Sequence, residues 1–334
     1  MLRKDALALS LVTFICASPF ALSAPDKLAV RSFSVVAPPA INNREASTVD
    51  QNDSIEFKES ANKKHYPIFF VTNRQPGNGK DGALKFTNDR SDTLTYGEYL
   101  PGEDAADMKQ ATAHIFASQN DFLSALKATG SKKAAVFVHG YRKSFSGSID
   151  FGMKMADHLD APLVVFAWPS KNNYCKYMVD ECTAEWSSHH LSQVLRQLGN
   201  NLGYHNLILV SHSLGARMVQ WGLRDLYTED KPAEPFAAAL FFSPDVDRDS
   251  FVHDAPFLKQ ACGDCRLYLD DHDTRIRISK FLHGSPRIGS FGKGPKEEQA
   301  LTNIFHCDTS LPSHHIPFEL VSNSVHQISE SEKE

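Results

Sequence analysis

One short run constrains the fold of this chain more than any other: residues 207–217, with the sequence LILVSHSLGAR. Its first four residues are leucine, isoleucine or valine and predict a buried strand, and an amphipathic helical pattern begins at Ser213 without a loop between them. A strand that turns directly into a helix strains the residue at the turn, so small residues are needed two positions before and after it. Ser211 and Gly215 meet this need, although glycine is commoner at the first position. The run therefore predicts a tight turn that presents the Ser213 hydroxyl at a helix N-terminus, which favours negative charge.

Other apolar runs that predict strands follow one another along the chain, separated by helical patterns. This alternation is typical of an α/β domain with a mostly parallel sheet and helices on both of its faces. The predicted strands span residues 67–71, 134–138, 163–167, 207–210, 238–242 and 265–269, with a weaker one at 303–306. Helix faces are marked by apolar residues at helical spacing: Ile149, Met153 and Ala156; Leu191, Val194, Leu195 and Leu198; and Val219, Leu223 and Leu226.

Length and charge restrict the organisation of the chain and its partners. The chain has 334 residues, and sheets of this kind commonly occupy about 200 to 300 residues as one unit. We expect one main domain at residues 65–330, preceded at 24–64 by a flexible linker rich in Ser, Asn, Asp, Glu and Lys. The net charge of −5 offers no attraction for nucleic acid. We therefore expect a small-molecule or lipid-like substrate and no nucleic-acid partner, and exposed loops are compatible with peripheral membrane contact.

The first residues have the pattern of an export signal. Arg3 and Lys4 precede a 17-residue apolar run at 6–22 that is interrupted only by Ser, Thr and Pro. A run of this length is short for a membrane span, and no second long apolar stretch follows it. We predict that residues 1–23 are a signal peptide that is cut after Ser23, and that the protein is exported to the periplasm or the extracellular space.

Removal of the signal would leave five cysteines in a compartment that permits disulfides. They are Cys175, Cys182, Cys262, Cys265 and Cys307. An odd number leaves at least one thiol free or paired between chains. The C-x-x-C formed by Cys262 and Cys265 fits a redox pair, half of a zinc site or a structural loop; because no second pair with zinc-like spacing follows, we expect structural disulfides and no metal. Cys175 and Cys182 lie in residues 172–186, where we expect a disulfide-closed rim over a pocket.

A second element with chemical meaning lies at residues 134–141, where the apolar strand in AAVFVHGY ends in His-Gly. Acyl transfer passes through a tetrahedral oxyanion, which two backbone N–H groups can stabilise. We expect these groups to come from Leu214, directly after the serine, and from Tyr141. His139 precedes the serine in the chain, so we expect it to shape the loop rather than act as the base. Trp168, at the end of the next strand, either lines the pocket or packs in the core.

A serine nucleophile also needs an acid and a base, which follow it in this order in α/β hydrolases. Acid candidates follow two predicted strands: Asp245 and Asp247 after 238–242, and Asp270, Asp271 and Asp273 after 265–269. Base candidates lie near the C-terminus: His314 and His315 after the last strand, with His306 and His326 less well placed. The base must lie within hydrogen-bond reach of Ser213.

Several blocks in one order resemble a bacterial α/β-hydrolase family catalogued mainly as a domain of unknown function. The blocks are FVTNR at 70–74, FVHGY at 137–141, FAWPS at 166–170, the run around Ser213, SPDVDR at 243–248, RIS at 277–279 and PRIG at 286–289. The resemblance covers residues 66–328 and implies an α/β-hydrolase fold with the activity of an esterase-like or lipase-like serine hydrolase.

The resemblance also selects among the acid and base candidates. The family's acid follows the penultimate strand, which implies Asp273, while Asp245 stays an alternative because some lipases place the acid after the preceding strand. The family's last motif is a small residue, a histidine and an aromatic residue a few positions later, which implies His315 with Phe318 as the aromatic. This sequence departs from the motif by doubling the histidine, and His314 therefore stays an alternative.

These residues together predict hydrolysis of carboxylic esters. Ser213 would attack the acyl carbonyl, His315 would take its proton and Asp273 would orient the histidine, with no metal or organic cofactor. Thioester or amide hydrolysis and acyl transfer would use the same groups. One alternative is a non-catalytic binding protein that keeps the fold. Another is a thiol redox protein that uses Cys262 and Cys265, although this C-x-x-C does not begin a helix after a strand.

Overall fold

A computed structural model describes residues 66–78, 84–100, 112–270, 272–290, 301, 305–308, 311 and 314–331. All of them lie in one compact unit, residues 60–334. The predicted signal peptide at 1–23 and the predicted linker at 24–64 lie outside the described residues and stay predictions. Among the described helices, none is both long and apolar enough to cross a membrane.

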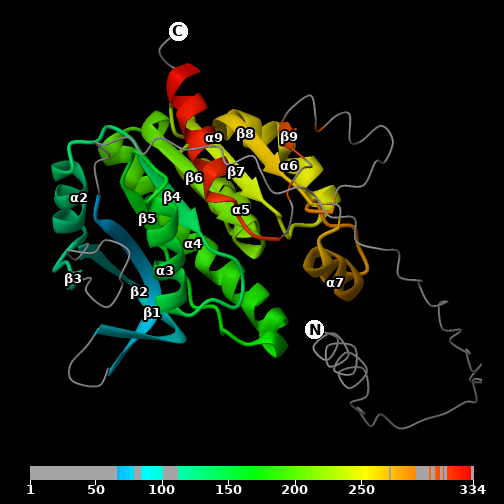
Figure 1. Cartoon of the computed structure of the whole chain (residues 1–334), viewed down its shortest axis with the longest axis horizontal. Helices are drawn as coiled ribbons and strands as arrows, with labels where there is room; N and C mark the ends of the chain where they lie inside the picture. Colours follow the sequence, from blue (N-terminus) through cyan, green and yellow to red (C-terminus); the bar gives the residue numbers. More distant parts are fainter. Residues whose placement is uncertain are drawn as a thin grey trace, which may run out of the picture. The chain divides into compact units, whose positions relative to one another are not determined.

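The described residues form a nine-stranded sheet with the strand order β3-β2-β1-β5-β4-β6-β7-β8-β9 (Figure 1). The strands are β1 (Ile68–Asn78), β2 (Leu84–Leu100), β3 (Thr112–Ile115), β4 (Ala134–Val138), β5 (Leu163–Phe166), β6 (Leu207–His212), β7 (Phe236–Phe242), β8 (Cys262–Tyr268) and β9 (His306–Asp308). The β1–β2 and β2–β3 pairs are antiparallel and all other neighbours are parallel. The predicted mostly parallel sheet is confirmed.

Helices cover both faces of this sheet. They are α2 (Gln119–Ala128), α3 (Phe145–Ala156), α4 (Tyr177–Leu202), α5 (Leu214–Glu229), α6 (Arg248–Ala261), α7 (Thr274–His283) and α9 (Phe318–Ser331), with 3-10 turns η2 (Tyr174–Lys176) and η3 (Tyr204–Asn206). One core cluster joins the sheet to apolar residues of α2, α4, α5 and α6, and a second joins its other face to residues of α3 and α9. The fold is therefore three-layered, as the alternating pattern predicts.

The central strands agree with the prediction, whereas the strands at the edges of the sheet differ from it. The central strands β4 to β7 lie where the apolar runs place them, because each is buried on both faces. Of the weak strand predicted at 303–306, residues 303 and 304 lie outside the described residues, and a strand of three residues, β9, is found at His306–Asp308. β2 and β3 were not predicted, since they form the antiparallel edge and their sequences LKFTNDRSDTLTYGEYL and TAHI are rich in polar residues.

The expected disulfides are absent from the described residues, where the five cysteines are free. The segment 172–186 is not a disulfide-closed rim: it is mostly helical, with Cys175 in η2 and Cys182 in α4. Seven residues of helix separate two Cα atoms by about 10 Å, beyond the reach of a disulfide. Cys262 and Cys265 are buried in β8, and a hydrogen bond that Cys262 donates to Cys265, together with burial, raises the pKa of the Cys262 thiol.

Candidate active site

The turn between β6 and α5 has the geometry that the sequence predicts for Ser213. β6 ends at His212 and α5 begins at Leu214, so Ser213 alone makes the turn, with φ 52° and ψ −121°. A non-glycine residue rarely adopts this conformation, which stores strain of about 1–3 kcal/mol. Two backbone hydrogen bonds hold it: Ser213 N–H donates to Phe242 O (3.0 Å), and Asp245 N–H donates to Ser213 O (3.1 Å). The strain is thus opposed by bonds to the loop after the neighbouring strand, β7.

Two glycines allow the turn to pack against the end of β4. A Cβ on Gly215 would lie 2.4 Å from Val138 O, a contact that no side chain can make. A Cβ on Gly140 would lie 3.0 Å from the Cβ of Ser213. The small residue two positions after the serine is therefore required by the β4 backbone, and the His-Gly loop lies directly against the serine.

The two groups expected to form an oxyanion hole are at the right places in the chain. Leu214 is the first residue of α5, and Tyr141 belongs to the loop that follows β4. Neither backbone N–H donates a hydrogen bond to another described residue. Two free N–H groups beside a strained serine are what oxyanion stabilisation needs. Their role stays a prediction.

His139 shapes the loop after β4. Its ring is buried and stacks on the indole of Trp168 at a centroid distance of 5.1 Å, and its Nδ1 lies 2.7 Å from Gly140 O. Burial, reinforced by the Arg74 charge, lowers the pKa of His139 well below its ordinary value. These contacts agree with the interpretation that His139 shapes the loop, and its role stays a prediction. Trp168 is fully buried and donates from Nε1 to His139 O (2.7 Å), so it packs in the core and does not line a pocket.

The carboxylate of Asp273 contacts His314 and not His315. Asp273 Oδ2 lies 2.5 Å from His314 Nδ1, and its Oδ1 accepts from the N–H groups of Arg275 (2.9 Å) and Ile276 (3.2 Å), which caps α7. Burial raises the pKa of Asp273, but the bonds from His314 and the two N–H groups outweigh it and leave the pKa below its ordinary value. Asp273 is thus an ionised, oriented partner for a histidine.

This contact corrects the expected pairing of Asp273 with His315. His314 is buried, whereas the side chain of His315 is exposed. Adjacent residues of a non-helical segment point in different directions, so only one of the two can face the end of β8. Partial shielding from water, followed by the charges of Arg275 and His314, lowers the pKa of the His315 ring.

His212, the residue before the serine, connects the turn to the histidine segment. Its Nε2 lies 2.6 Å from His314 O, and the two rings are 4.7 Å apart. Since a carbonyl oxygen only accepts, His212 Nε2 must carry a hydrogen. Burial and then the His314 charge lower the pKa of His212 well below its ordinary value, so it is neutral. His212 therefore links the turn that carries Ser213 to the backbone of His314.

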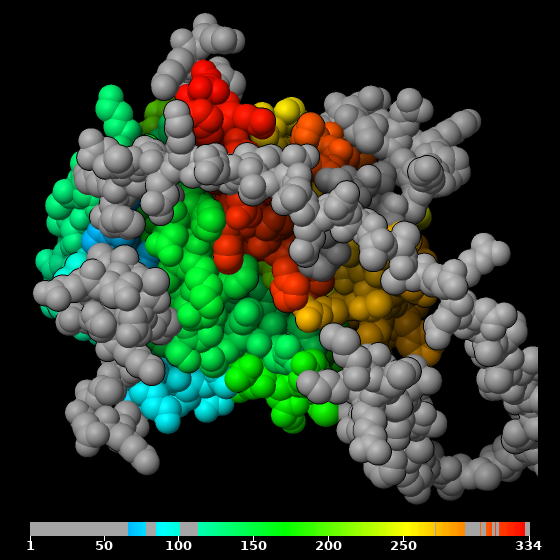
Figure 2. Space-filling model, in the orientation of Figure 1, coloured from blue at the N-terminus to red at the C-terminus, as the bar shows by residue number. Residues whose placement is uncertain are grey.

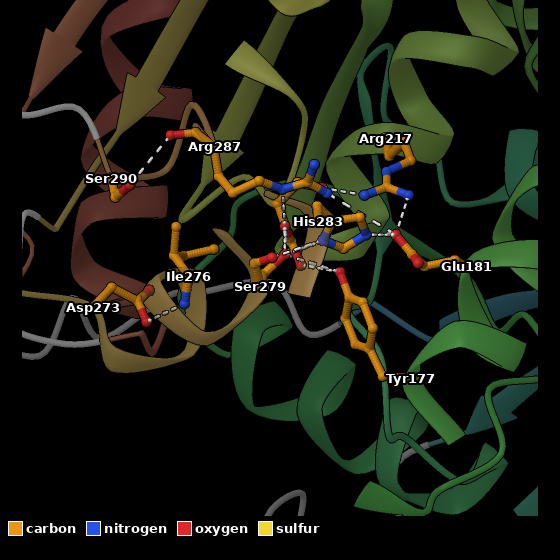
Figure 3. A network of polar contacts seen from close by, with 10 residues as sticks. Tyr177, Glu181, Arg217, Asp273, Ile276, Ser279, His283, Arg287 and Ser290 are labelled. Carbon is orange, nitrogen blue, oxygen red and sulfur yellow. Dashed lines mark hydrogen bonds and ion pairs between the residues drawn. The ribbon is translucent and has the colours of Figure 1, made fainter. Parts of the chain in front are cut away.

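The rival acid, Asp245, has other partners, and Figure 3 labels three of them, Arg287, Ser279 and Tyr177. Arg287 Nε donates to its Oδ1 (2.8 Å), as does the Ser279 hydroxyl (2.6 Å), and the Tyr177 hydroxyl donates to Oδ2. Burial raises the pKa of Asp245, but the Arg287 charge and these hydrogen bonds outweigh it. Glu181 extends the network, with Arg217 Nη1 at 2.5 Å and His283 Nε2 at 2.7 Å. Asp245 is thus part of a buried polar network between helices and does not contact a histidine.

The remaining candidates are not brought to the turn. Asp247 caps α6 and accepts from Ser250 N–H, and Asp270 accepts from His272 N–H. His326 pairs with Glu330 on α9, and His306 is exposed in β9. Asp271 lies outside the described residues.

Two supporting groups were not predicted from the sequence. Asp180, buried in α4, accepts from the Ser170 hydroxyl (2.5 Å), Lys171 N–H (2.8 Å) and Arg142 N–H (3.3 Å), so it joins the loops after β4 and β5. Arg74 of β1 donates to Ala167 O (3.1 Å) and Lys143 O (2.8 Å) in the same two loops. The only sequence signal for the role of Arg74 is its place in the FVTNR block, which the resemblance to the family includes. Among the described residues, no group of three or more His, Cys, Asp or Glu could hold a metal ion.

A strained serine between a strand and a helix, on a mostly parallel sheet covered on both faces, defines an α/β hydrolase. A family model matches residues 114–313, which is more than half of the chain, and its description is "Alpha/beta hydrolase of unknown function (DUF900)". The chain belongs to this family. The predicted α/β-hydrolase fold and the resemblance are confirmed.

Solved structures with low identity are similar to this chain. They include lipase B of Aspergillus fumigatus (17% identity, 40% of this chain and 31% of that chain, TM-score 0.27). Another is a putative hydrolase of the alpha/beta superfamily from Xanthomonas campestris pv. campestris (11% identity, 60% of this chain and 99% of that chain, TM-score 0.37). A third is a carboxylesterase from Mesorhizobium loti (12% identity, 59% of this chain and 89% of that chain, TM-score 0.36). Because the identities and TM-scores are low, these similarities indicate nothing about the activity or substrate of this chain. No curated protein matched it.

Proposed function

We propose that the protein hydrolyses carboxylic esters through an acyl-enzyme on Ser213, with His314 as the base and Asp273 as the acid. One observation carries the proposal: the Asp273–His314 hydrogen bond of 2.5 Å forms on the segment whose backbone carbonyl accepts a hydrogen bond from His212, the residue before the strained serine. Membership of an α/β-hydrolase family supports it. His314 takes the place that the sequence assigned to His315.

The tautomer of His314 follows from its partner. An ionised Asp273 only accepts hydrogen bonds, so His314 Nδ1 carries the hydrogen and Nε2 has a free lone pair. Nε2 takes the proton of Ser213 as Oγ attacks the acyl carbon, and the oxyanion is bound by the N–H groups of Leu214 and Tyr141. His314 then gives the proton to the leaving alcohol, and water resolves the acyl-enzyme by the same steps in reverse.

Labelling with a fluorophosphonate probe tests the proposal, because the probe reacts only with an activated serine. We expect the wild type to be labelled and Ser213→Ala and His314→Ala to remain unlabelled, while His315→Ala keeps most of the labelling. Circular dichroism and urea unfolding would establish that each variant is folded. Labelling that needs His315 and not His314 would refute the assignment of the base, and an unlabelled folded wild type would favour a non-catalytic binding protein.

Wild-type protein that has not been treated with the probe would then be given p-nitrophenyl esters, thioesters and amides of matched acyl groups. Of the three substrate types, we expect the esters to be hydrolysed with the largest kcat/KM. Preferential transfer of the acyl group to an added alcohol would instead indicate an acyltransferase that uses the same residues.

Export of the protein is part of the proposal and rests on the sequence of residues 1–23. Expression of the whole chain in a bacterial host, followed by mass spectrometry of the periplasmic fraction, should give a protein that begins at residue 24. An intact N-terminus in the cytoplasmic fraction would contradict export.

A further inference from the structure

Helix α7 presents an unusual surface next to the candidate active site. Seven of its ten residues are exposed: Thr274, Arg275, Arg277, Ile278, Lys280, Phe281 and Leu282. They combine three large apolar side chains with three cations, and the helix contains no acidic residue. Figure 2 shows α7, in orange, at the surface of the molecule.

A second apolar group lies on the neighbouring segment of η2 and the start of α4. Tyr174 is 73% exposed, Met178 61% and Val179 39%. These three residues and Ile278, Phe281 and Leu282 make up six of the eight exposed large hydrophobic residues in the described part of the chain, and we call them the α4–α7 patch. Such clustering on a soluble surface marks an interaction site.

Contacts between polar residues join the two helices that carry most of the patch. The Tyr177 hydroxyl lies 3.2 Å from Ser279 Oγ, and Glu181 pairs with His283 at 2.7 Å (Figure 3). These polar residues join α4 to α7, and the apolar residues of the patch are exposed residues of η2, α4 and α7.

The patch borders the candidate active site. Asp273, the proposed acid, caps α7, and the ring of Tyr177 packs on that of Tyr141 at 5.2 Å. The guanidinium of Arg142, next to Tyr141, lies 3.5 Å from the ring of Tyr174. A partner that covers the patch would therefore lie beside the loop that carries the proposed oxyanion hole.

Charge identifies the kind of partner. Exposed cations surround the patch (Lys176, Arg275, Arg277 and Lys280), while the acidic residues at its inner edge, Asp180 and Glu181, are buried and hydrogen-bonded. This local excess of positive charge contrasts with the net charge of −5 of the whole chain. A second copy of the chain is disfavoured, because a two-fold contact would bring these cations against one another.

We infer that the α4–α7 patch docks on an anionic lipid surface, with its apolar side chains in the interface and its cations at the lipid headgroups. Basic and apolar residues combined on one helix surface are typical of interfacial binding. The inference deepens the proposed function, since a docked protein would take its acyl ester from the lipid layer. It predicts a lipid-embedded ester as the substrate class.

Flotation with vesicles tests the docking without measuring activity. The processed protein, purified from the periplasm of an expression host, would be mixed with vesicles of phosphatidylcholine alone or with phosphatidylglycerol. The wild type should float with the anionic vesicles, and added salt should weaken binding. Ser213→Ala should bind equally well, so a failure of the proposed chemistry would not affect this result.

Paired variants test the apolar part. Ile278→Ser with Phe281→Ser should lower vesicle binding at least about tenfold, because two exposed apolar side chains leave the interface. Leu100→Ser with Ile115→Ser, in exposed residues of β2 and β3, is the matched control and should change binding less than about twofold. Hydrolysis of a dispersed short-chain ester should be unchanged in both, whereas hydrolysis of a vesicle-embedded ester should fall only in the first.

A charge variant tests the electrostatic part. Arg277→Gln with Lys280→Gln should weaken binding to anionic vesicles about 25-fold, or about fivefold for each cation, and leave binding to neutral vesicles unchanged. Lys85→Gln with Lys132→Gln is the control. A wild type that does not bind anionic vesicles would overturn the inference, as would an equal loss in the controls. A patch variant that converts a dimer to a monomer while keeping vesicle binding would instead assign the patch to a second copy.

Discussion

Replacement of Asp273 by Asn should lower the activity strongly while it changes the stability of the fold only slightly. Asp273 uses its two oxygens differently: Oδ1 accepts from two N–H groups at the start of α7, and Oδ2 contacts His314. Asn is as good a helix cap as Asp, so Asp273→Asn can keep the cap with its single oxygen. Its NH₂ group then faces His314 Nδ1 and can only donate to it.

This donation reverses the tautomer of His314. Nδ1 must accept, so the hydrogen moves to Nε2, the atom that is proposed to take the proton of Ser213. Loss of the correct tautomer in a serine triad lowers kcat by about 10⁴, or about 5.5 kcal/mol. The free energy of unfolding should change by only about 1 kcal/mol, because the cap survives and one charged hydrogen bond is replaced by a neutral one.

Asp245→Asn is the matched control, since it makes the same replacement of one carboxylate oxygen by an NH₂ group in the other buried acid candidate. Asp245 accepts from Arg287 at 2.8 Å, and Arg287 is only 3% exposed. Its loss leaves the buried Arg287 with only a longer ion pair, 4.0 Å, to Glu181, which should lower the free energy of unfolding by up to about 3–5 kcal/mol. Folded Asp245→Asn protein should keep kcat within about tenfold of the wild type, because the Asp273–His314 pair is untouched.

The assays are steady-state hydrolysis of p-nitrophenyl esters and urea unfolding of all three proteins at one pH. Activity of Asp273→Asn within tenfold of the wild type would refute the role of the Asp273–His314 contact. A larger loss of kcat in folded Asp245→Asn than in Asp273→Asn would instead assign the acid to the other carboxylate.

Three further predictions concern the elements that support the site. Gly215→Ala should lower the free energy of unfolding by about 1–3 kcal/mol in urea titrations, because a Cβ would lie 2.4 Å from Val138 O; an unchanged midpoint would contradict the close packing. Trp168→Phe should cost about 1–3 kcal/mol, since it leaves the buried His139 O without its donor, and a smaller loss would mean that water replaces the indole. The lowered pKa of His139 means that the unfolded chain binds the extra proton as the pH falls below about 6.5, so stability should fall by up to about 1.4 kcal/mol per pH unit from this residue. His139→Gln should show a correspondingly shallower dependence of the urea midpoint on pH, and an identical slope would contradict the assignment.

The central fold could be predicted because its strands are buried on both faces. β4, β5, β6 and β7 are short continuous apolar runs, and a run of this kind has few alternatives to a covered parallel strand. The edge strand β2 could not be found in the same way. Its long sequence is mixed and polar, and pairing with β1, with two shifts in register, determines its course.

The turn at Ser213 could be predicted because the small residues that it requires lie in one short run of the sequence, at 211 and 215. The contact that excludes a side chain at residue 215, with Val138 O of β4, could not be seen in that run. The choice between His314 and His315 is not local. It depends on which ring faces Asp273, 41 residues earlier in the chain, and a motif that fits either histidine contains no information about that direction.

The two acid candidates lie at the ends of neighbouring strands, and their partners explain why only one can act as an acid. Asp245 faces an arginine and two hydroxyl groups, so its charge is already neutralised and its oxygens are already used. Its backbone N–H nevertheless donates to Ser213 O (3.1 Å), directly opposing the strain of the serine. Asp273 instead faces an imidazole, which can gain a proton and then needs a negative charge beside it. We therefore expect Asp245 to hold the nucleophile in its strained geometry and Asp273 to stabilise the charge that the reaction creates.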